Sequence, residues 1–414
     1  MKASAGKRVL MLLENNPYPH DGRVRREATA LVQAGYQVSV ISPRRHDQGW
    51  RDTIDGVHVY RYPAPPSKGG IVGYLLEYGY SLIGAFVLSL VVWAQRGFDV
   101  IHAHNPPDIF VLIALPYKLL GKRFVFDHHD LSPEMYNALF KDGGNPLLFR
   151  MLVWFEQLSC KVADHVIATN ESYKRMEMER SGVPAERISV VRNGPDLKRV
   201  RLVEPDSQLR SKGKTIIGYV GIMGFQDGLD YLLRALHLLV YDLGRTDFYC
   251  ILIGTGDAWE TLKKMTADLK LNEHVWLTGN ISDTDLMRYL SSTDICVDPD
   301  PSNPFTDRCS MIKMTEYMAL SKPIVAFDLP EHRVTAQDAC LYAKANDELD
   351  FARKLAELMD DPARQVAMGK LGRQRVETAL AWHYSIPHLL NAYRQVLAAP
   401  VADGASEEPI LLHK

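Results

Sequence analysis

The sequence predicts an α/β protein made of two Rossmann-like domains that face each other across a cleft. Short apolar runs alternate with helical stretches through the first half of the chain. A polar stretch at 195–213, broken by two prolines, then interrupts the pattern, and the alternation restarts at Thr215. Strands that alternate with helices form parallel sheets with right-handed crossovers. A length of 414 residues fits two such domains, which we place at 1–205 and 206–381, before a helix at 382–398 and a disordered tail at 399–414.

The first half supplies the strands of one sheet. We expect them at 9–13, 38–42, 57–62, 99–102, 123–127, 165–169 and 188–191, with a helix at 22–34 that ends near Gly35. Asn193 and Gly194 form the turn that closes this domain.

The second half repeats the plan with its own strands. These are expected at 215–221, 248–254, 275–278, 295–297, 324–327 and 340–343, with a helix at 231–239. Two domains of this kind bind ligands beyond the carboxyl ends of their strands, so the cleft between the domains is the expected site.

Composition excludes several classes of protein. The first 205 residues carry five more cations than anions and the remainder seven fewer. Such a mildly basic half suits a phosphate or membrane surface and is too weak to argue for nucleic acid. The five cysteines form no CxxC pair and there is no signal-peptide pattern. We therefore expect a cytoplasmic protein, with peripheral contact at the inner face of the plasma membrane through 71–94 as an open alternative.

One segment breaks the alternation. Residues 78–94 contain no charged side chain, and the length of this segment is close to the minimum for spanning a bilayer. The strand at 99–102 must rejoin its sheet, and a single crossing would separate the two parts. We expect a buried core helix or an in-plane membrane-contacting helix rather than a span.

Two strand-to-helix turns contain glycines. At the first, Asp21, Gly22 and Arg23 open a helix whose free amides could attract phosphate. At the second, Gly221 and Gly224 lie between a strand and a helix. No GxGxxG motif is present, which argues against a nicotinamide or flavin enzyme. Ordinary turns remain the alternative at both places.

The stretch 298–333 carries the stronger signal. Ser310 is expected to cap a helix over 311–320, on which Lys313 and Glu316 lie three residues apart on one face. A lysine would contact phosphate and a glutamate would accept hydrogen bonds from ribose hydroxyls, so the pair suits a nucleoside diphosphate. A surface ion pair is the alternative. Asp298 and Asp300 imitate a DxD metal motif, but the neighbouring prolines indicate a rigid loop, and we expect no metal.

These residues resemble a known family. The run 310–326, SMIKMTEYMALSKPIVA, resembles the "EAMA-x-G-x-PV-x-A" signature of family-4 retaining glycosyltransferases of the GT-B fold. The order of elements resembles that family over nearly the whole chain, including a last helix that crosses back to the first domain. The variants DGRVRREA, HNPPD and MGFQDG look most like bacterial surface-polysaccharide transferases, some of which handle N-acetylated deoxyhexosamines such as L-fucosamine.

The resemblance implies a donor site and also departs from it. The first glutamate of the family's E-x7-E motif would stand at Arg308, eight residues before Glu316. The family's diphosphate-binding cations correspond to Ile222 and Asp227. We hypothesise that Arg308 and Lys313 replace them. Base contacts are expected near Gly279, Asn280 and Ile281, with UDP favoured through the resemblance alone.

The first domain contributes the reacting side of the site. His129 and Asp130 follow a strand and match the family's active-site histidine position, where an imidazole can hydrogen-bond the donor sugar or move a proton. Glu134 is near enough in sequence to assist His129. The alternatives are that His128 and His129 form a histidine pair satisfied in a core, or that they belong to a metal site. His102 and His104 end another strand and are expected to line the acceptor side or to pack in the core. Glu331 follows another strand and is expected to contact sugar hydroxyls or to cap a helix.

The predicted activity is retaining transfer of a sugar, an N-acetylated hexosamine or deoxyhexosamine, from a nucleotide donor to a lipid-linked or polysaccharide acceptor. Negative charge develops on the departing diphosphate, and fixed cations and helix N-termini stabilise it. No cofactor is expected beyond the donor. Two alternatives stay open: a nucleotide-sugar 2-epimerase of the same fold, and a non-catalytic membrane-associated partner of another transferase.

Overall fold

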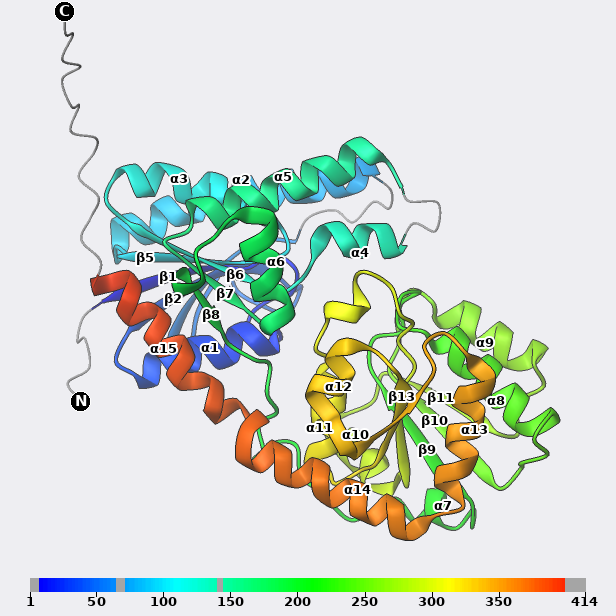
Figure 1. Ribbon diagram of the computed structural model, residues 1–414. Helices are drawn as coiled ribbons and strands as arrows, with labels where there is room; N and C mark the ends of the chain where they lie inside the picture. Colours follow the sequence, from blue (N-terminus) through cyan, green and yellow to red (C-terminus); the bar gives the residue numbers. More distant parts are fainter. Residues whose placement is uncertain (1–6, 65–70, 140–143, 399–414) are drawn as a thin grey trace, which may run out of the picture.

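The computed structural model describes residues 7–64, 71–139 and 144–398, and gives only the backbone of residues 71, 72, 74 and 75. It contains two α/β domains, each with one sheet covered by helices on both faces (Figure 1). The predicted fold class is therefore confirmed. The expected tail at 399–414 lies outside the described residues.

The first domain has an eight-stranded sheet in the order β3-β4-β2-β1-β5-β6-β7-β8. Its strands are parallel except for β3, which pairs antiparallel with β4 at the edge. The strands are β1 (Arg8–Leu12), β2 (Gln37–Arg44), β3 (Arg51–Ile54), β4 (Val57–Pro63), β5 (Val100–His104), β6 (Arg123–His128), β7 (His165–Ala168) and β8 (Ile188–Val190). The sequence analysis missed β3, which is exposed for most of its length and has no apolar alternation to mark it.

The helices of this domain begin and end where short polar residues or glycine allow. The Asp21 side chain accepts a hydrogen bond from the Val24 amide and so starts the first helix, while Gly182 takes a left-handed conformation and ends another. The helices are α1 (Gly22–Gln33), α2 (Ile71–Gln95), α3 (Val111–Leu119), α4 (Ser132–Leu139), α5 (Pro146–Val162) and α6 (Glu171–Ser181).

The second domain has a six-stranded parallel sheet in the order β11-β10-β9-β12-β13-β14. Its strands are β9 (Thr215–Val220), β10 (Phe248–Ile253), β11 (Val275–Gly279), β12 (Ile295–Asp298), β13 (Ile324–Phe327) and β14 (Cys340–Ala343). Its helices are α7 (Ser207–Arg210), α8 (Leu229–Tyr241), α9 (Trp259–Asp268), α10 (Asp283–Ser292), α11 (Ile312–Ala319), α12 (Pro330–Ala336), α13 (Glu348–Met359) and α14 (Pro362–Arg375). All five cysteines are buried and unpaired, so no disulfide links these elements.

The last helix, α15 (Trp382–Ala398), returns to the first domain (Figure 1). Its Tyr393 hydroxyl lies 2.8 Å from Nδ1 of His102 on β5. Where the two connections between the domains pass each other, the Trp382 amide donates to the Pro195 carbonyl at 3.1 Å. A Cβ added to Gly194 would lie 2.0 Å from the Leu380 carbonyl oxygen, so only glycine fits at this crossing.

Candidate functional site

Asn105 organises the predicted reacting loop at the carboxyl ends of β5 and β6. Its side-chain oxygen accepts from the amides of His129 at 2.8 Å and Asp130 at 3.1 Å. Its nitrogen donates to the Asp130 carbonyl at 2.6 Å and to Asp108 at 3.1 Å. One buried amide therefore fixes the backbone of both residues that the sequence predicts to be catalytic.

Asp127 lies against the buried side of the His129 ring. Its Oδ1 lies 3.4 Å from Nδ1 of His129, and its Oδ2 lies 3.1 Å from Nδ1 of His104. The His129 side chain keeps 14% of its surface exposed, whereas His104 is fully buried. Burial opposes protonation of His129, but the hydrogen bond and charge of Asp127 outweigh it, and the pKa of His129 is raised. His129 is thus held and accessible, as a hydrogen-bond donor to a substrate must be.

Arg23 holds Asp127 in turn. Its Nε and Nη2 donate to the two carboxylate oxygens at 2.8 and 2.9 Å, and Nη1 donates to the Val191 carbonyl at 3.0 Å. The arginine side chain is only 5% exposed. The prediction that Arg23 binds donor phosphate is therefore not supported, because its donors are used inside the domain. Asp21 and Gly22, at the start of the same helix, remain on the accessible side, and a Cβ added at Gly22 would meet no atom within 4 Å.

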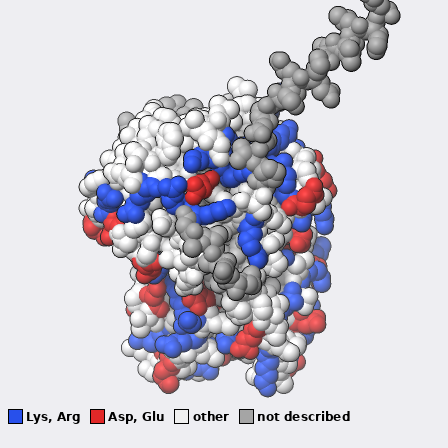
Figure 2. Space-filling view, turned by 90° about the vertical axis from the view of Figure 1, so that its left-hand side faces the viewer, with Lys and Arg blue, Asp and Glu red and all other residues white. Residues whose placement is uncertain are grey.

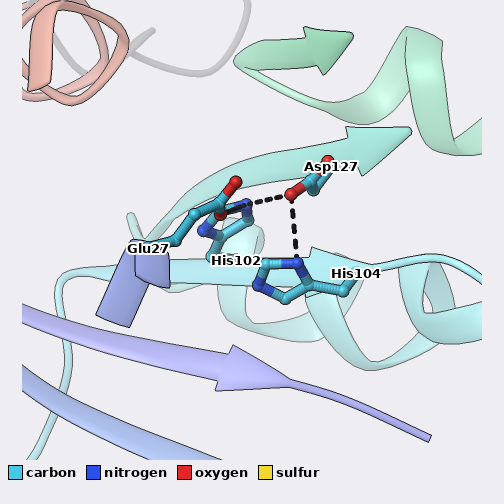
Figure 3. A group of neighbouring side chains, drawn as sticks. All are labelled: Glu27, His102, His104 and Asp127. Carbon is cyan, nitrogen blue, oxygen red and sulfur yellow. Dashed lines mark ion pairs between the residues drawn. The ribbon is translucent and has the colours of Figure 1, made fainter. Parts of the chain in front are cut away.

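Four buried side chains behind this loop lie close enough together to hold a metal ion: Glu27, His102, His104 and Asp127 (Figure 3). Nε2 of His102 is 3.9 Å from Glu27 and 3.8 Å from Asp127. Arg23 already supplies a positive charge to both carboxylates. Burial raises the pKa of Glu27 well above its usual value and lowers the pKa of His102 well below it. Arg23 is therefore the counter-charge that this buried group has in the described structure.

Two other predicted residues of this loop point away from the cleft. The carboxylate of Glu134 pairs with Arg180, which also binds Glu156 at 3.1 Å. The prediction that Glu134 assists the reaction is therefore wrong in this conformation. His128 is fully buried between Glu156 and Glu177, whose charges raise its pKa against the effect of burial. Core packing, the alternative for the histidine pair, thus applies to His128 and not to His129.

Glu14 is a buried carboxyl group just beyond the carboxyl end of β1, and the sequence analysis did not single it out as a site residue. It accepts a hydrogen bond from Ser81 on α2 at 3.0 Å and is 5% exposed. Burial raises its pKa to about 7. The signal in the sequence is weak, because a glutamate after a strand is usually solvated.

We expect Glu14→Gln to stabilise the protein above neutral pH. The folded state holds a proton on Glu14 up to pH about 7, whereas the unfolded state releases it near pH 4.5. Stability therefore falls as the pH rises between these values, and the amide removes that loss. Chemical denaturation should show a gain of about 1–3 kcal/mol at pH 8 and none at pH 4. Glu260→Gln, at an exposed helix position, is the control; equal gains in both variants would contradict the assignment.

Lys313 is the central cation of the second domain's site. Its ammonium lies 3.2 Å from Asp298 and 2.9 Å from Asp300, and its side chain is 10% exposed. Burial disfavours its charge, but these two carboxylates raise its pKa well above the usual value. Burial and the charge of Asp298 keep the pKa of Asp300 well above its usual range. The predicted direct contact between Lys313 and phosphate is not supported, because two aspartates already hold the ammonium.

The same pairing bears on the imitation DxD motif. Asp298, Asp300 and His332 could together hold a metal ion, yet the Lys313 ammonium lies against both carboxylates. Nδ1 of His332 is 2.9 Å from the Phe327 carbonyl, which fixes its proton there. Lysine thus supplies the counter-charge for this group.

We expect Lys313→Met to destabilise the second domain by about 3–5 kcal/mol, because it leaves buried carboxylates without their cation. Thermal or denaturant unfolding measures this directly. Adding Asp298→Asn should recover a large part of the loss, because Asp298 is the carboxylate whose pKa is lowered by Lys313 and whose charge is left unpaired. Lys263→Met, on the exposed face of α9, should change stability little. If the single and double variants unfold alike, the buried pair does not carry this stability.

The glycine-rich turn after β9 is tightly packed. A Cβ on Gly221 would lie 2.8 Å from the Tyr219 hydroxyl, and one on Gly228 would lie 2.0 Å from the Pro299 carbonyl oxygen. The amide of Gly224 donates to the Asp227 carboxylate at 2.8 Å. Asp227 thus occupies an amide that a phosphate would use, which makes this turn a poor phosphate cradle by itself.

Glu316 lies on α11, which runs over Ile312–Ala319 and therefore starts one residue later than predicted. The Ser310 cap is wrong: its hydroxyl donates to Glu331 instead. Burial raises the pKa of Glu316, while Arg199 and then Arg26 act in the opposite direction. Within the described part of the chain, no hydrogen bond or ion pair engages its carboxylate. Glu316 is the predicted site residue with the clearest unused acceptor.

Glu331 joins the two domains. Its carboxylate accepts from Ser172 of α6 at 2.5 Å and from Ser310 at 2.9 Å, and it is 2% exposed. Neither sugar contact nor helix capping describes this arrangement. Asn170 adds hydrogen bonds to the Arg308 carbonyl at 2.8 Å and the Ser310 hydroxyl at 2.9 Å. These contacts bring the short helix η3 (Thr306–Arg308) against the first domain.

The other predicted donor residues remain at the carboxyl edge of the second sheet. The guanidinium of Arg308 donates to the Pro304 carbonyl at 2.5 Å. Gly279 ends β11 with φ 74°, and Asn280 after it is exposed, while Ile281 packs against the core. Two cavities of about 460 and 600 Å³ lie elsewhere, beside α7 and beside β7, and no predicted site residue lines them.

Comparison with known proteins shows which families the two domains match. Residues 22–194 match the family described as glycosyl transferase 4-like domain, and residues 201–375 match glycosyl transferases group 1. An uncharacterized glycosyltransferase of Methanocaldococcus jannaschii is 26% identical over 72% of this chain and 73% of its own length. A D-inositol 3-phosphate glycosyltransferase of Kineococcus radiotolerans is 22% identical over 92% and 91%.

Solved structures share the two-domain fold. Sucrose-phosphate synthase from Thermosynechococcus elongatus superposes with a TM-score of 0.77, at 18% identity, over 95% of this chain and all of the other. HepE of Anabaena in complex with UDP and glucose gives a TM-score of 0.70 at 15% identity, over 94% and 99%. With both domains matched and the two sheets arranged as in these proteins, the chain belongs to the family-4 type of GT-B glycosyltransferases.

Proposed function

We propose that the protein is a retaining glycosyltransferase that moves a sugar from a UDP-linked donor to a lipid-linked or polysaccharide acceptor in bacterial surface-glycan synthesis. The observation that carries the donor assignment is the unpartnered, half-buried carboxylate of Glu316 on α11. Its neighbours Arg26 and Arg199 favour the ionised form, which accepts hydrogen bonds from two ribose hydroxyls. The transferred sugar is an N-acetylated hexosamine or deoxyhexosamine in this proposal.

His129 is proposed to act on the donor sugar from the opposite domain. Its ring is exposed on one side and anchored by Asp127 on the other, and its raised pKa favours the donor form of the imidazole. Asp130 lies beside His129. Burial is the main cause that raises the pKa of the Cys309 thiol in the second domain, and the charge of the nearby Asp130 raises it further. The proposed site therefore takes groups from both domains, as transfer between two bound substrates requires.

The departing diphosphate needs positive charge, and the pattern of cations differs from the family's. Lys313 is occupied by two aspartates, so we assign the diphosphate to Arg308 and to the amides at the start of α1 around Gly22. Arg308 has a carbonyl partner and not a carboxylate in the described structure, so its charge is available. The proposed reaction uses these groups without a metal ion.

A panel of nucleotides and nucleotide sugars tests the donor. Ligand at a hundred times its Kd stabilises the folded state by about 2.7 kcal/mol, which a thermal-shift assay resolves. We expect UDP and UDP-N-acetylhexosamines to raise the melting temperature, and Glu316→Gln to reduce the rise to half or less. A shift with GDP alone would contradict the UDP assignment, and epimerisation of the sugar without acceptor would favour an epimerase.

A further inference from the structure

Helix α2 carries apolar side chains on its exposed face, where an ordinary surface helix is polar. The face that packs on β1, β2 and β4 contains Ser81, Ala85, Ser89 and Val92, all fully buried, with Leu88 partly buried beside them. Most of the other large apolar side chains of α2 are exposed. The exposed ones on α2 are Leu76, Tyr80, Ile83, Phe86, Val87, Leu90 and Trp93. The predicted buried core helix is therefore wrong, because burial would require the large side chains to face the sheet.

Neighbouring helices extend this apolar face. Tyr117 of α3 contacts α2 through the Ser89 hydroxyl at 2.9 Å and an edge-to-face contact with Trp93. Helix α5 packs beside α3, and the three helices lie together along one side of the first domain (Figure 1). The exposed apolar residues that follow on α3 and α5 are Leu112, Leu119, Leu120, Leu147 and Trp154. We call this combined surface of α2, α3 and α5 the apolar face.

Cations border the apolar face at one end. All three helices return from the cleft side of the sheet and end at the amino ends of the next strands, as right-handed crossovers must. Arg96, Lys118, Lys122 and Lys161 stand at or just beyond those helix ends. Figure 2 shows the result: a broad uncharged area at the top of the molecule with a band of Lys and Arg beneath it.

We infer that the apolar face docks on an anionic phospholipid bilayer, with α2 lying in the plane of the interface. Leu, Ile and Phe side chains would enter the acyl boundary, while Tyr80, Trp93 and Trp154 suit the headgroup level. Lys122 and Lys161 would meet lipid phosphates, whereas Lys118 is paired with Asp164 and Arg96 donates to the Tyr60 hydroxyl. This docking adds a membrane surface to the proposed function. It rests on that function, because the proposed function supplies the lipid-linked acceptor.

The structure distinguishes this docking from a membrane span. Residues 76–95 are long and apolar enough to cross a bilayer, and 22% of the most apolar 18-residue window within them is buried. However, β4 before α2 and β5 after it belong to the same sheet, so the helix runs along the domain rather than away from it. A bordering row of cations also fits lipid phosphates better than a second copy of the same basic surface, which would repel it.

The orientation connects the bilayer to the site. Ser81, on the inner face of α2, donates to Glu14 just beyond the carboxyl end of β1. The amino-terminal half of α2 therefore lies at the cleft side of the domain, and the cation row lies at the opposite end. A lipid-linked acceptor in the docked bilayer would enter the cleft beside this part of α2.

Co-sedimentation of the full chain with vesicles tests the docking. We expect binding to phosphatidylcholine vesicles that contain phosphatidylglycerol, weaker binding to pure phosphatidylcholine, and loss of the difference at high salt. Ile83→Glu with Val87→Glu should reduce binding at least tenfold, because two charges enter the apolar face. Lys122→Glu with Lys161→Glu should reduce binding to the anionic vesicles alone, by about fivefold or more for each charge.

The control is Val366→Glu with Leu371→Glu, an equally exposed pair on α14 of the second domain, which should bind like wild type. Undiminished binding of Ile83→Glu/Val87→Glu would overturn the proposal, and so would a change from dimer to monomer in that variant without vesicles. Transfer to a short water-soluble acceptor separates the two claims. Turnover without vesicle binding rejects the docking alone, whereas vesicle binding without turnover on any acceptor rejects the proposed function alone.

Discussion

Replacing His129 by alanine is expected to lower the rate of sugar transfer by about 10²–10⁴-fold, the usual contribution of a positioned proton donor or acceptor. The ring lies at the accessible end of a buried chain that runs through Asp127 to Arg23. The alanine substitution removes the imidazole that would contact the substrate and leaves the buried ion pair between Asp127 and Arg23 intact. Initial rates at saturating donor measure the effect, and the unfolding temperature should be nearly unchanged.

The pH profile distinguishes a chemical role from a structural one. Because Asp127 raises the pKa of His129, the imidazolium persists to higher pH than usual. If it donates to the substrate, the rate is constant below that pKa and falls as the pH rises through it. His129→Ala should lose this limb, whereas His383→Ala, at an exposed position of α15, should keep both rate and profile. An unchanged profile in His129→Ala would remove the residue from the reaction.

Replacing Glu316 by glutamine should weaken UDP binding by about ten- to a hundredfold, because a hydrogen bond to a charged group contributes about 1.5–3 kcal/mol. The carboxylate has no protein partner in the described structure, so the substitution should leave folding intact. Isothermal titration with UDP measures the loss.

The sign of the pH dependence is a second test of Glu316. Its pKa is raised by burial, and ribose hydroxyls donate to the ionised form. Binding by wild type should therefore weaken as the pH falls through the raised pKa, and binding by Glu316→Gln should not. Asp283→Asn removes an exposed charge near the same position and serves as the control. Tight, pH-independent binding by wild type would contradict the ribose assignment.

The fold was predictable because parallel strands buried on both faces appear in the sequence as short apolar runs. All strands except the exposed β3 were placed this way. Helix α2 was misjudged for a physical reason: hydrophobicity tells which residues avoid water, but not whether protein or lipid replaces the water. Which residues of α2 are buried, among them Ser81, Ala85, Ser89 and Val92, is known only once the sheet beneath the helix is known.

The sequence predicted which residues lie near the cleft better than it predicted which side chains they contact. The end of a strand predicted the place of His129, whereas Glu316 was predicted from its helix and from the resemblance to the family signature. Lys313 and Arg23 were expected to meet phosphate, and each instead neutralises buried aspartates from other strands. Spacing along one helix cannot reveal such partners, because Asp298 and Asp127 reach them through the tertiary fold. Glu331 was missed as a bridge between domains for the same reason.

The most direct test of the central claim is transfer itself. Wild-type protein, a UDP-N-acetylhexosamine labelled in the sugar, and a membrane fraction containing lipid-linked glycans should yield labelled product in the lipid extract. The anomeric configuration, determined by NMR, should match that of the donor. The double variant His129→Ala/Glu316→Gln should yield none. A product of inverted configuration would contradict the proposed retention of configuration. Labelled free sugar or epimer without any labelled lipid or polysaccharide, or equal transfer by the double variant, would contradict the proposed activity and its site between the two domains.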